Sequence, residues 1–174
     1  MISGKTLLRF WQQLGIAGMM MLSQSLLAAE QQPANITDIQ ADNLPQFVSQ
    51  LSNDYYQQLE SLVTYYQLYQ QKRDPRGFNV WHLRGFSPAF KEQQTYYQNL
   101  LATASAETQP TAEKLVAIFN ALDTISTQLM ISFRENDPVA YQQAQTLVSD
   151  NNALLAAQLK QFALEAEIRE INLN

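Results

Sequence analysis

Apolar side chains recur at steps of three and four residues along the chain after residue 43. This spacing places one apolar side chain per turn on the same face of an α-helix. The first predicted helix begins near Asn43 and tolerates Pro45 in its first turn. It ends at 74–77, where a proline disfavours helix at the residue before it and a glycine permits a reversal. Its predicted apolar face consists of Val48, Leu51, Tyr55, Leu59, Leu62, Tyr66 and Tyr69.

Three later proline-containing pairs predict the starts of three further helices, because proline suits the first helical position. Ser87-Pro88 predicts the second, Pro110-Thr111 the third and Asp137-Pro138 the fourth, which runs to about Ile171. The predicted apolar positions are Phe90, Tyr97, Leu100, Leu101 and Ala104 in the second helix, Leu115, Ile118, Phe119, Leu122, Ile125, Leu129 and Phe133 in the third, and Tyr141, Ala144, Val148, Leu155, Leu159 and Phe162 in the fourth.

Four amphipathic helices joined by short connections favour antiparallel neighbours, since each helix must bury its apolar face. The sequence therefore predicts an all-α fold, an up-down bundle of about four helices over residues 44–174. The absence of glycine after Gly85 argues against a turn-rich β fold. Residues 30–43 form a polar lead-in that is either ordered or disordered. Exposed heptads are also compatible with a homodimer that associates as a coiled coil does.

The first 29 residues have the order of a secretory signal. Lys5 and Arg9 provide a basic start, an apolar stretch runs over 14–22, and small residues end at Ala28 and Ala29. The apolar run is too short to span a membrane, which takes about 20 residues. We therefore predict a signal peptide over 1–29 and a periplasmic or secreted domain with no stable membrane insertion after cleavage.

Composition narrows the chemistry. The chain has no cysteine and a single histidine, so the usual zinc, copper and attached-haem sites lack ligands, and the sequence predicts no metal and no cofactor. No Gly-x-Ser-x-Gly elbow, catalytic cysteine or glycine-rich phosphate loop occurs. Without residues 1–29 the chain keeps nine basic and sixteen acidic residues, a net charge of −7, which makes nucleic acid a poor partner.

One connection concentrates the basic charge. Five of those nine basic residues lie within 72–91, with a single acid and several aromatic side chains among them. In one interpretation the aromatics plug the end of the bundle. In the other, the segment grips a partner, since arginine and tryptophan commonly carry interface energy. The two interpretations do not exclude each other, and the candidate binding residues are Arg73, Arg76, Trp81, His82, Arg84 and Phe86.

These observations predict an exported, non-enzymatic protein that acts by contacts, as an envelope accessory or a binding module. The expected partner at 72–91 is another envelope protein or an anionic ligand. The alternative is a periplasmic carrier that holds a small apolar or anionic ligand between helices lined by Tyr66, Tyr69 and Phe119. Adjacent glutamines fill the polar faces, as in Gln57-Gln58, Gln70-Gln71, Gln93-Gln94 and Gln142-Gln143. They indicate either a face suited to helix-on-helix association with a partner or simply a solvated surface of good helix formers.

Overall fold

The computed structural model describes the backbone of residues 36–172 and the side chains of residues 36–163. The predicted signal segment 1–29 and the first part of the lead-in lie outside the described residues. The helices are α3 (Leu44–Lys72), α4 (Pro75–Trp81), the π-helical segment η1 (His82–Phe86), α5 (Ser87–Leu101), α6 (Gln109–Glu135) and α7 (Pro138–Asn172).

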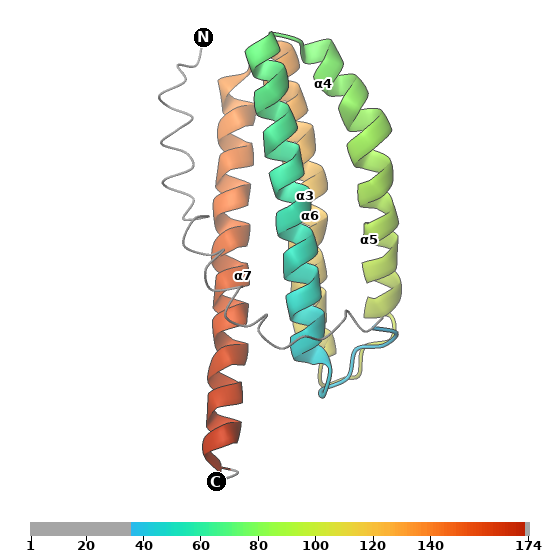
Figure 1. Ribbon diagram of the computed structural model, residues 1–174, viewed down its shortest axis with the longest axis vertical. Coiled ribbons are helices and arrows are strands. Elements are labelled where there is room, and N and C mark those ends of the chain that lie inside the picture. The colour runs from blue at the N-terminus through green and yellow to red at the C-terminus, as the bar shows by residue number, and fades with distance from the viewer. Residues whose placement is uncertain (1–35, 173–174) are drawn as a thin grey trace. The chain divides into compact units, whose positions relative to one another are not determined.

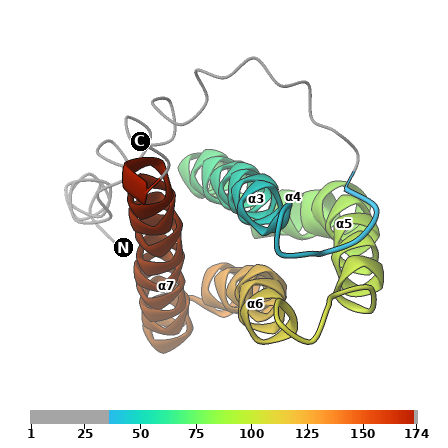
Figure 2. The ribbon, with the colours of Figure 1, turned by 90° about the horizontal axis from the view of Figure 1, so that it is seen from below.

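These elements form the predicted all-α, up-down bundle. The chain ascends through α3, returns through α4, η1 and α5, ascends again through α6, and returns through α7 (Figure 1). An end-on view shows α6 beside α3, with α5 and α7 on opposite sides of that pair (Figure 2), and α6 contacts all three. Among the described helices only α6 is long and apolar enough to cross a membrane, but half of its apolar window is buried inside the bundle.

Three of the four predicted helix starts are confirmed. Pro45 and Pro110 stand in the first turns of α3 and α6. The Asp137 carboxylate accepts hydrogen bonds from the backbone N–H groups of Val139 (2.8 Å) and Ala140 (3.3 Å), which caps α7 as the sequence predicts.

The predicted start of the second helix at Ser87-Pro88 is wrong. The helix begins twelve residues earlier, at Pro75, where the Asp74 carboxylate accepts a hydrogen bond from the Gly77 N–H (2.8 Å). Ser87 has helical backbone angles and does not cap. The chain continues through Pro88 because η1 precedes it, with the Ser87 N–H bonded five residues back to the His82 carbonyl.

The π-helical segment has a visible cause in the sequence. Phe78, His82, Phe86 and Phe90 are spaced by four residues each time, and all four are buried. In a continuous α-helix of 3.6 residues per turn, such positions drift around the helix. The wider π turn cancels this drift and keeps the four rings on one side. We call these four side chains the aromatic column.

The core follows the predicted apolar faces closely. All predicted positions of α3 except Tyr69 are buried, and Phe47 joins them. Leu101, Ala104, Phe133, Tyr141, Leu159 and Phe162 are only partly buried. The described part of the lead-in is packed as well. Ile36 and Ile39 are buried, and the Ile39 carbonyl accepts hydrogen bonds from the Ser105 N–H (3.1 Å) and the Thr108 hydroxyl (2.9 Å).

Polar side chains join α5 to its neighbours. Between α3 and α5, Gln58 bonds to Gln93 (2.7 Å) and the Tyr97 hydroxyl donates to Asp54 (2.6 Å). Between α5 and α6, Gln94 donates to Asn120 (3.1 Å). One glutamine of the 57–58 pair and both of the 93–94 pair therefore join helices of the same bundle.

We predict that Gly77→Ala destabilises the fold. A Cβ at this position would lie within 3 Å of the capping Asp74 carboxylate and of the Tyr69 ring, so one of them must move. Overpacking and loss of the cap together outweigh the helix propensity gained, for a net loss of about 1–2 kcal/mol. Urea denaturation followed by circular dichroism measures it.

Gly85→Ala is the matched control. A Cβ there meets only ordinary contacts at 3.4 Å from the Trp81 indole. This substitution should leave the free energy of unfolding unchanged or raise it by up to about 1 kcal/mol. Equal effects of the two substitutions would show that the Asp74 cap does not set the α3–α4 turn.

Candidate functional site

Five of the six predicted site residues lie on the α4–η1–α5 rod, and the sixth, Arg73, is the C-cap of α3. Phe86 and His82 are buried and Trp81 is partly buried, so these three face the bundle. Arg73, Arg76 and Arg84 are exposed. The structure therefore contains side chains suited to each interpretation of the 72–91 segment. The aromatics pack inward, and the arginines remain available.

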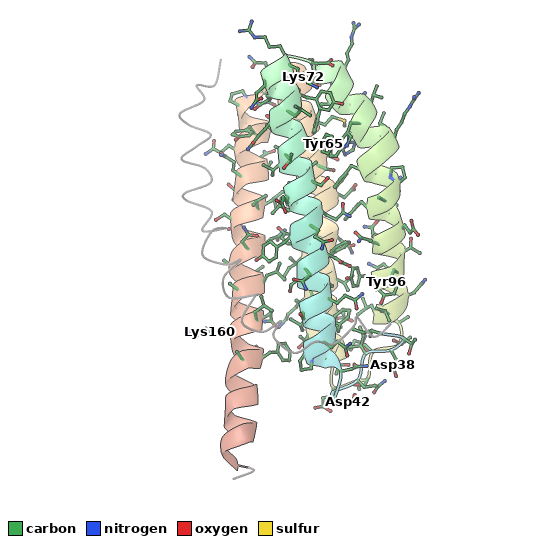
Figure 3. All side chains as sticks on the ribbon, viewed as in Figure 1. Asp38, Asp42, Tyr65, Lys72, Tyr96 and Lys160 are labelled. Atoms are coloured by element: carbon green, nitrogen blue, oxygen red, sulfur yellow. The ribbon has the colours of Figure 1, made fainter. Side chains whose placement is uncertain are left out.

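Trp81 belongs to the packing side. Its indole stacks on the Tyr65 ring, with centroids 4.2 Å apart and planes 13° from parallel, and it also contacts Phe78 and Phe86. Figure 3 shows Tyr65 on α3 below Lys72, near the end where α3 meets α4. Trp81 therefore closes the seam between α3 and α4, and its stacking fixes α4 against the bundle.

His82 makes one side-chain hydrogen bond, between Nε2 and the Ser126 hydroxyl (3.0 Å). Because that hydroxyl donates to the Asp123 carbonyl oxygen (2.9 Å), we assign the ring proton to Nε2, which then donates to the Ser126 oxygen. The other ring nitrogen, Nδ1, is buried and has no partner among the described residues. Burial lowers the pKa of His82, and the Asp123 charge offsets this only in part.

This pairing of serine and histidine is structural in its geometry. A nucleophilic serine needs its proton taken by the histidine and needs room for a substrate. Ser126 instead gives its proton to a backbone carbonyl and is 0% exposed. The bond anchors the aromatic column of α4–α5 to α6.

The exposed side of the rod carries a row of residues at the same spacing of four. Arg76, Val80 and Arg84 lie opposite the aromatic column, and Leu83 lies beside them. Val80 and Leu83 are 50% and 57% exposed, which is comparable to Val139 (59%) and Leu154 (54%) on α7. We call Arg76, Val80, Leu83 and Arg84 the outer row.

The arginines of this region have no acidic partner. The one ion pair among the described side chains joins Arg134 to Glu135, far along the chain. Asp74, the only acid within 72–91, is engaged in capping α4. Arg73, Arg76 and Arg84 are therefore exposed cations without a counter-charge on the described surface.

The sequence predictions missed Val80 and Leu83. The sequence predicts a connection between helices over 72–91, and aliphatic residues in a connection have no helical periodicity to mark them. The available signal was the constant spacing of four in Phe78, His82 and Phe86. Extended to the opposite side, this spacing aligns Val80 with the two arginines.

A second group of polar side chains is buried between α3 and α7. Tyr66 stacks on Tyr141, and the two helices are antiparallel. Eleven residues back along α3 and eleven residues forward along α7 therefore bring Tyr55 level with Asn152. Of the six buried side-chain atoms without a hydrogen-bond partner in the described region, five belong to this group, which consists of Ser52, Tyr55, Asn151 and Asn152.

The chemistry of this buried polar group is neutral. Burial raises the pKa of the Tyr55 hydroxyl well above its ordinary value, with Asn151 offsetting a small part, so all four side chains are uncharged at neutral pH. The group offers no cation to an anionic ligand. The residues expected to line a carrier site do not meet either. Phe119 packs on Phe90 and Tyr97, whereas Tyr66 and Tyr69 pack on Phe78.

No group of three or more histidine, aspartate and glutamate side chains in the described region is arranged to hold a metal ion.

A scan against protein-family models, a search of the curated proteins and a search of solved structures each found no match to this chain. The class that fold and site define is an all-α bundle with one basic, partly apolar helical surface.

We predict that the protein loses stability as the pH falls from 7 to 5, and that His82 causes the loss. His82 has a lowered pKa in the folded state and titrates near 6.5 when unfolded. The unfolded chain therefore binds the proton first, and protonation favours unfolding below that pH. Urea denaturation at several pH values measures the slope.

His82→Gln is the matched variant, because its amide can still donate to Ser126 but does not titrate. The chain has no other histidine, so this variant should show a flat profile between pH 7 and 5.5. A slope that survives the substitution would assign the effect to carboxylates.

We also predict that Asn152→Leu stabilises the bundle. Both polar atoms of this amide are buried without partners in the described region, at a cost of about 1–3 kcal/mol that leucine removes. Ser149→Leu, at an exposed position on α7, controls for helix propensity. A loss of stability in Asn152→Leu alone would mean that the amide is satisfied in solution.

Proposed function

We propose that this chain is an exported, non-enzymatic protein that binds a partner protein through the outer row of α4 and η1. The observation that carries the proposal is the pairing of exposed Val80 and Leu83 with two unpaired arginines on one rigid face. Isolated exposed aliphatics are common on proteins. Two of them flanked by cations without counter-charges form the composition of a binding surface.

The energetic argument favours contact with another protein. Removing the exposed halves of Val80 and Leu83 from water contributes on the order of 1 kcal/mol each. Arginine adds hydrogen bonds of fixed geometry to carboxylates, and its guanidinium loses less hydration than an ammonium group on binding. Neither contribution requires the surface to rearrange.

Rigidity supports the same proposal. The outer row stands on a rod whose other side is fixed by the aromatic column, with ring centroids 5.5 Å apart from His82 to Phe86 and 5.6 Å from Phe86 to Phe90. The His82–Ser126 bond adds a polar anchor. A surface that is ordered before binding loses little conformational entropy when the partner docks.

The distribution of charge supports a specific orientation. Lys72 lies at the end of the bundle where α3 meets α4, and Asp38 and Asp42 lie at the opposite end (Figure 3). Glu135 and Asp137 of the α6–α7 turn lie at the same end of the up-down bundle as Lys72. The basic charge therefore belongs to the segment 72–84, and an acidic partner is attracted to that segment. The signal-like residues 1–29 are the reason for proposing a partner in the cell envelope.

We expect a partner to crosslink at Val80 and not on α7. The chain has no cysteine, so Val80→Cys and Ser149→Cys each provide one reactive site for a thiol-linked photo-crosslinker. Both positions are exposed. In envelope extract of the source organism, the Val80→Cys protein should yield a discrete adduct, detected by electrophoresis and mass spectrometry, and the Ser149→Cys protein should not.

The same crosslinking experiment also tests whether binding depends on the two arginines of the outer row. Adding Arg76→Ala and Arg84→Ala to Val80→Cys should reduce the adduct severalfold while helical circular dichroism stays unchanged. Equal adducts at both cysteines, or an adduct indifferent to the arginines, would remove the outer row as a binding surface.

A further inference from the structure

We infer that the element that docks on the outer row is an acidic amphipathic helix of the partner. This inference rests on the proposed function and adds the chemical class of the ligand. It follows from the order of residues along the row, which is a cation, an aliphatic side chain and a second cation.

The geometry of the row is that of a helix-sized strip. Arg76 and Arg84 are eight residues apart on the same side of the rod, or roughly 12 Å at 1.5 Å per residue. Val80 lies midway, and Leu83 widens the apolar part. A helix packed along the rod would present its own side chains at three- and four-residue spacing. Two acids seven or eight residues apart, with leucine or isoleucine between them, match both arginines and Val80.

A small anion fits this surface poorly. Arg76 and Arg84 do not converge on one point, since Val80 separates them by a full turn on each side. In the described region, the buried polar atoms without partners belong to the four side chains between α3 and α7 and to His82, whose Nδ1 faces the inner side of the rod. None of these atoms lies at the outer row, so no buried polar group there supports an anion. Phosphate alone would therefore find only separate, hydrated guanidinium groups.

An anionic membrane fits poorly for a different reason. Beyond residues 1–29 and 72–91, the chain carries four basic and fifteen acidic residues, a net charge of −11. A lipid surface meets a wide area of the protein and is repelled by that charge. A single helix meets only the row. Two aliphatic side chains also bury far less than membrane-bound helices do.

The test uses the full chain and two synthetic helical peptides of equal composition. In the first peptide, glutamates at positions i and i+7 flank leucines at i+3 and i+4. In the second, the glutamates are moved to the opposite face. Each peptide carries a fluorophore, and binding is measured by anisotropy at low and at physiological salt. Anionic vesicles of phosphatidylglycerol and inorganic phosphate are the competing probes.

The first peptide should bind more tightly than the second, and Arg76→Gln with Arg84→Gln should weaken its binding by roughly 2- to 30-fold, as expected for two exposed ion pairs. Val80→Ser should weaken it as well. Arg134→Gln, which alters an exposed arginine on α6, should leave it unchanged. Raising the salt concentration should weaken binding to the wild type more than binding to the double variant.

Equal binding of the two peptides, insensitivity to both arginines, or stronger binding to vesicles or phosphate would each overturn this inference. These failures are distinct from failure of the proposed function. If the Val80→Cys adduct forms and depends on the arginines while the peptides do not bind, the surface stands and its ligand is not an acidic helix. If no adduct forms, the surface itself is lost.

Discussion

The aromatic column is the constraint on which the second rod of the bundle depends. Phe78, His82, Phe86 and Phe90 are all buried at a spacing of four residues, and the π turn among them keeps the four rings on one side. That turn also lets the chain continue through Pro88. The structure therefore has one continuous rod where the sequence predicts a connection followed by a shorter helix. The packing of the buried side of this rod determines where the residues on its exposed side lie.

The apolar spacing of α3, α6 and α7 made those helices predictable, since 3.6-residue periodicity and capping prolines agree there. The same rules placed the second helix too late. Ser87-Pro88 has the composition of a helix start, and Asp74-Pro75-Arg76-Gly77 was interpreted only as a stop. Asp74 has two roles, because it follows the end of α3 and its carboxylate also caps the start of α4. A search for apolar residues with the α-helical period of 3.6 misses the aromatic column, whose residues are spaced by four.

The candidate site was predictable in composition and not in arrangement. Counting charges identifies 72–91, but it cannot say that Trp81, His82 and Phe86 point inward while Arg76 and Arg84 point outward. That division requires the π turn. Nor could the sequence show that Ser126, 44 residues along the chain from His82, bonds to its imidazole, because tertiary pairing of polar residues leaves no periodic trace.

Two buried polar features of the bundle have opposite consequences. His82 has one bond and lies in the rod that carries the outer row, so its uncharged state keeps that rod packed. Asn151 and Asn152 of α7 have three buried side-chain atoms without partners in the described region. The helix α7 lies on the other side of the α3–α6 pair from α5 (Figure 2). The packed aromatic column lies beneath the exposed arginines, although Nδ1 of His82 has no partner there, whereas the other unpartnered polar atoms of the described region lie between α3 and α7. A surface that is ordered before binding loses less conformational entropy when a partner docks, so the packing of the column supports the proposed contact at the outer row.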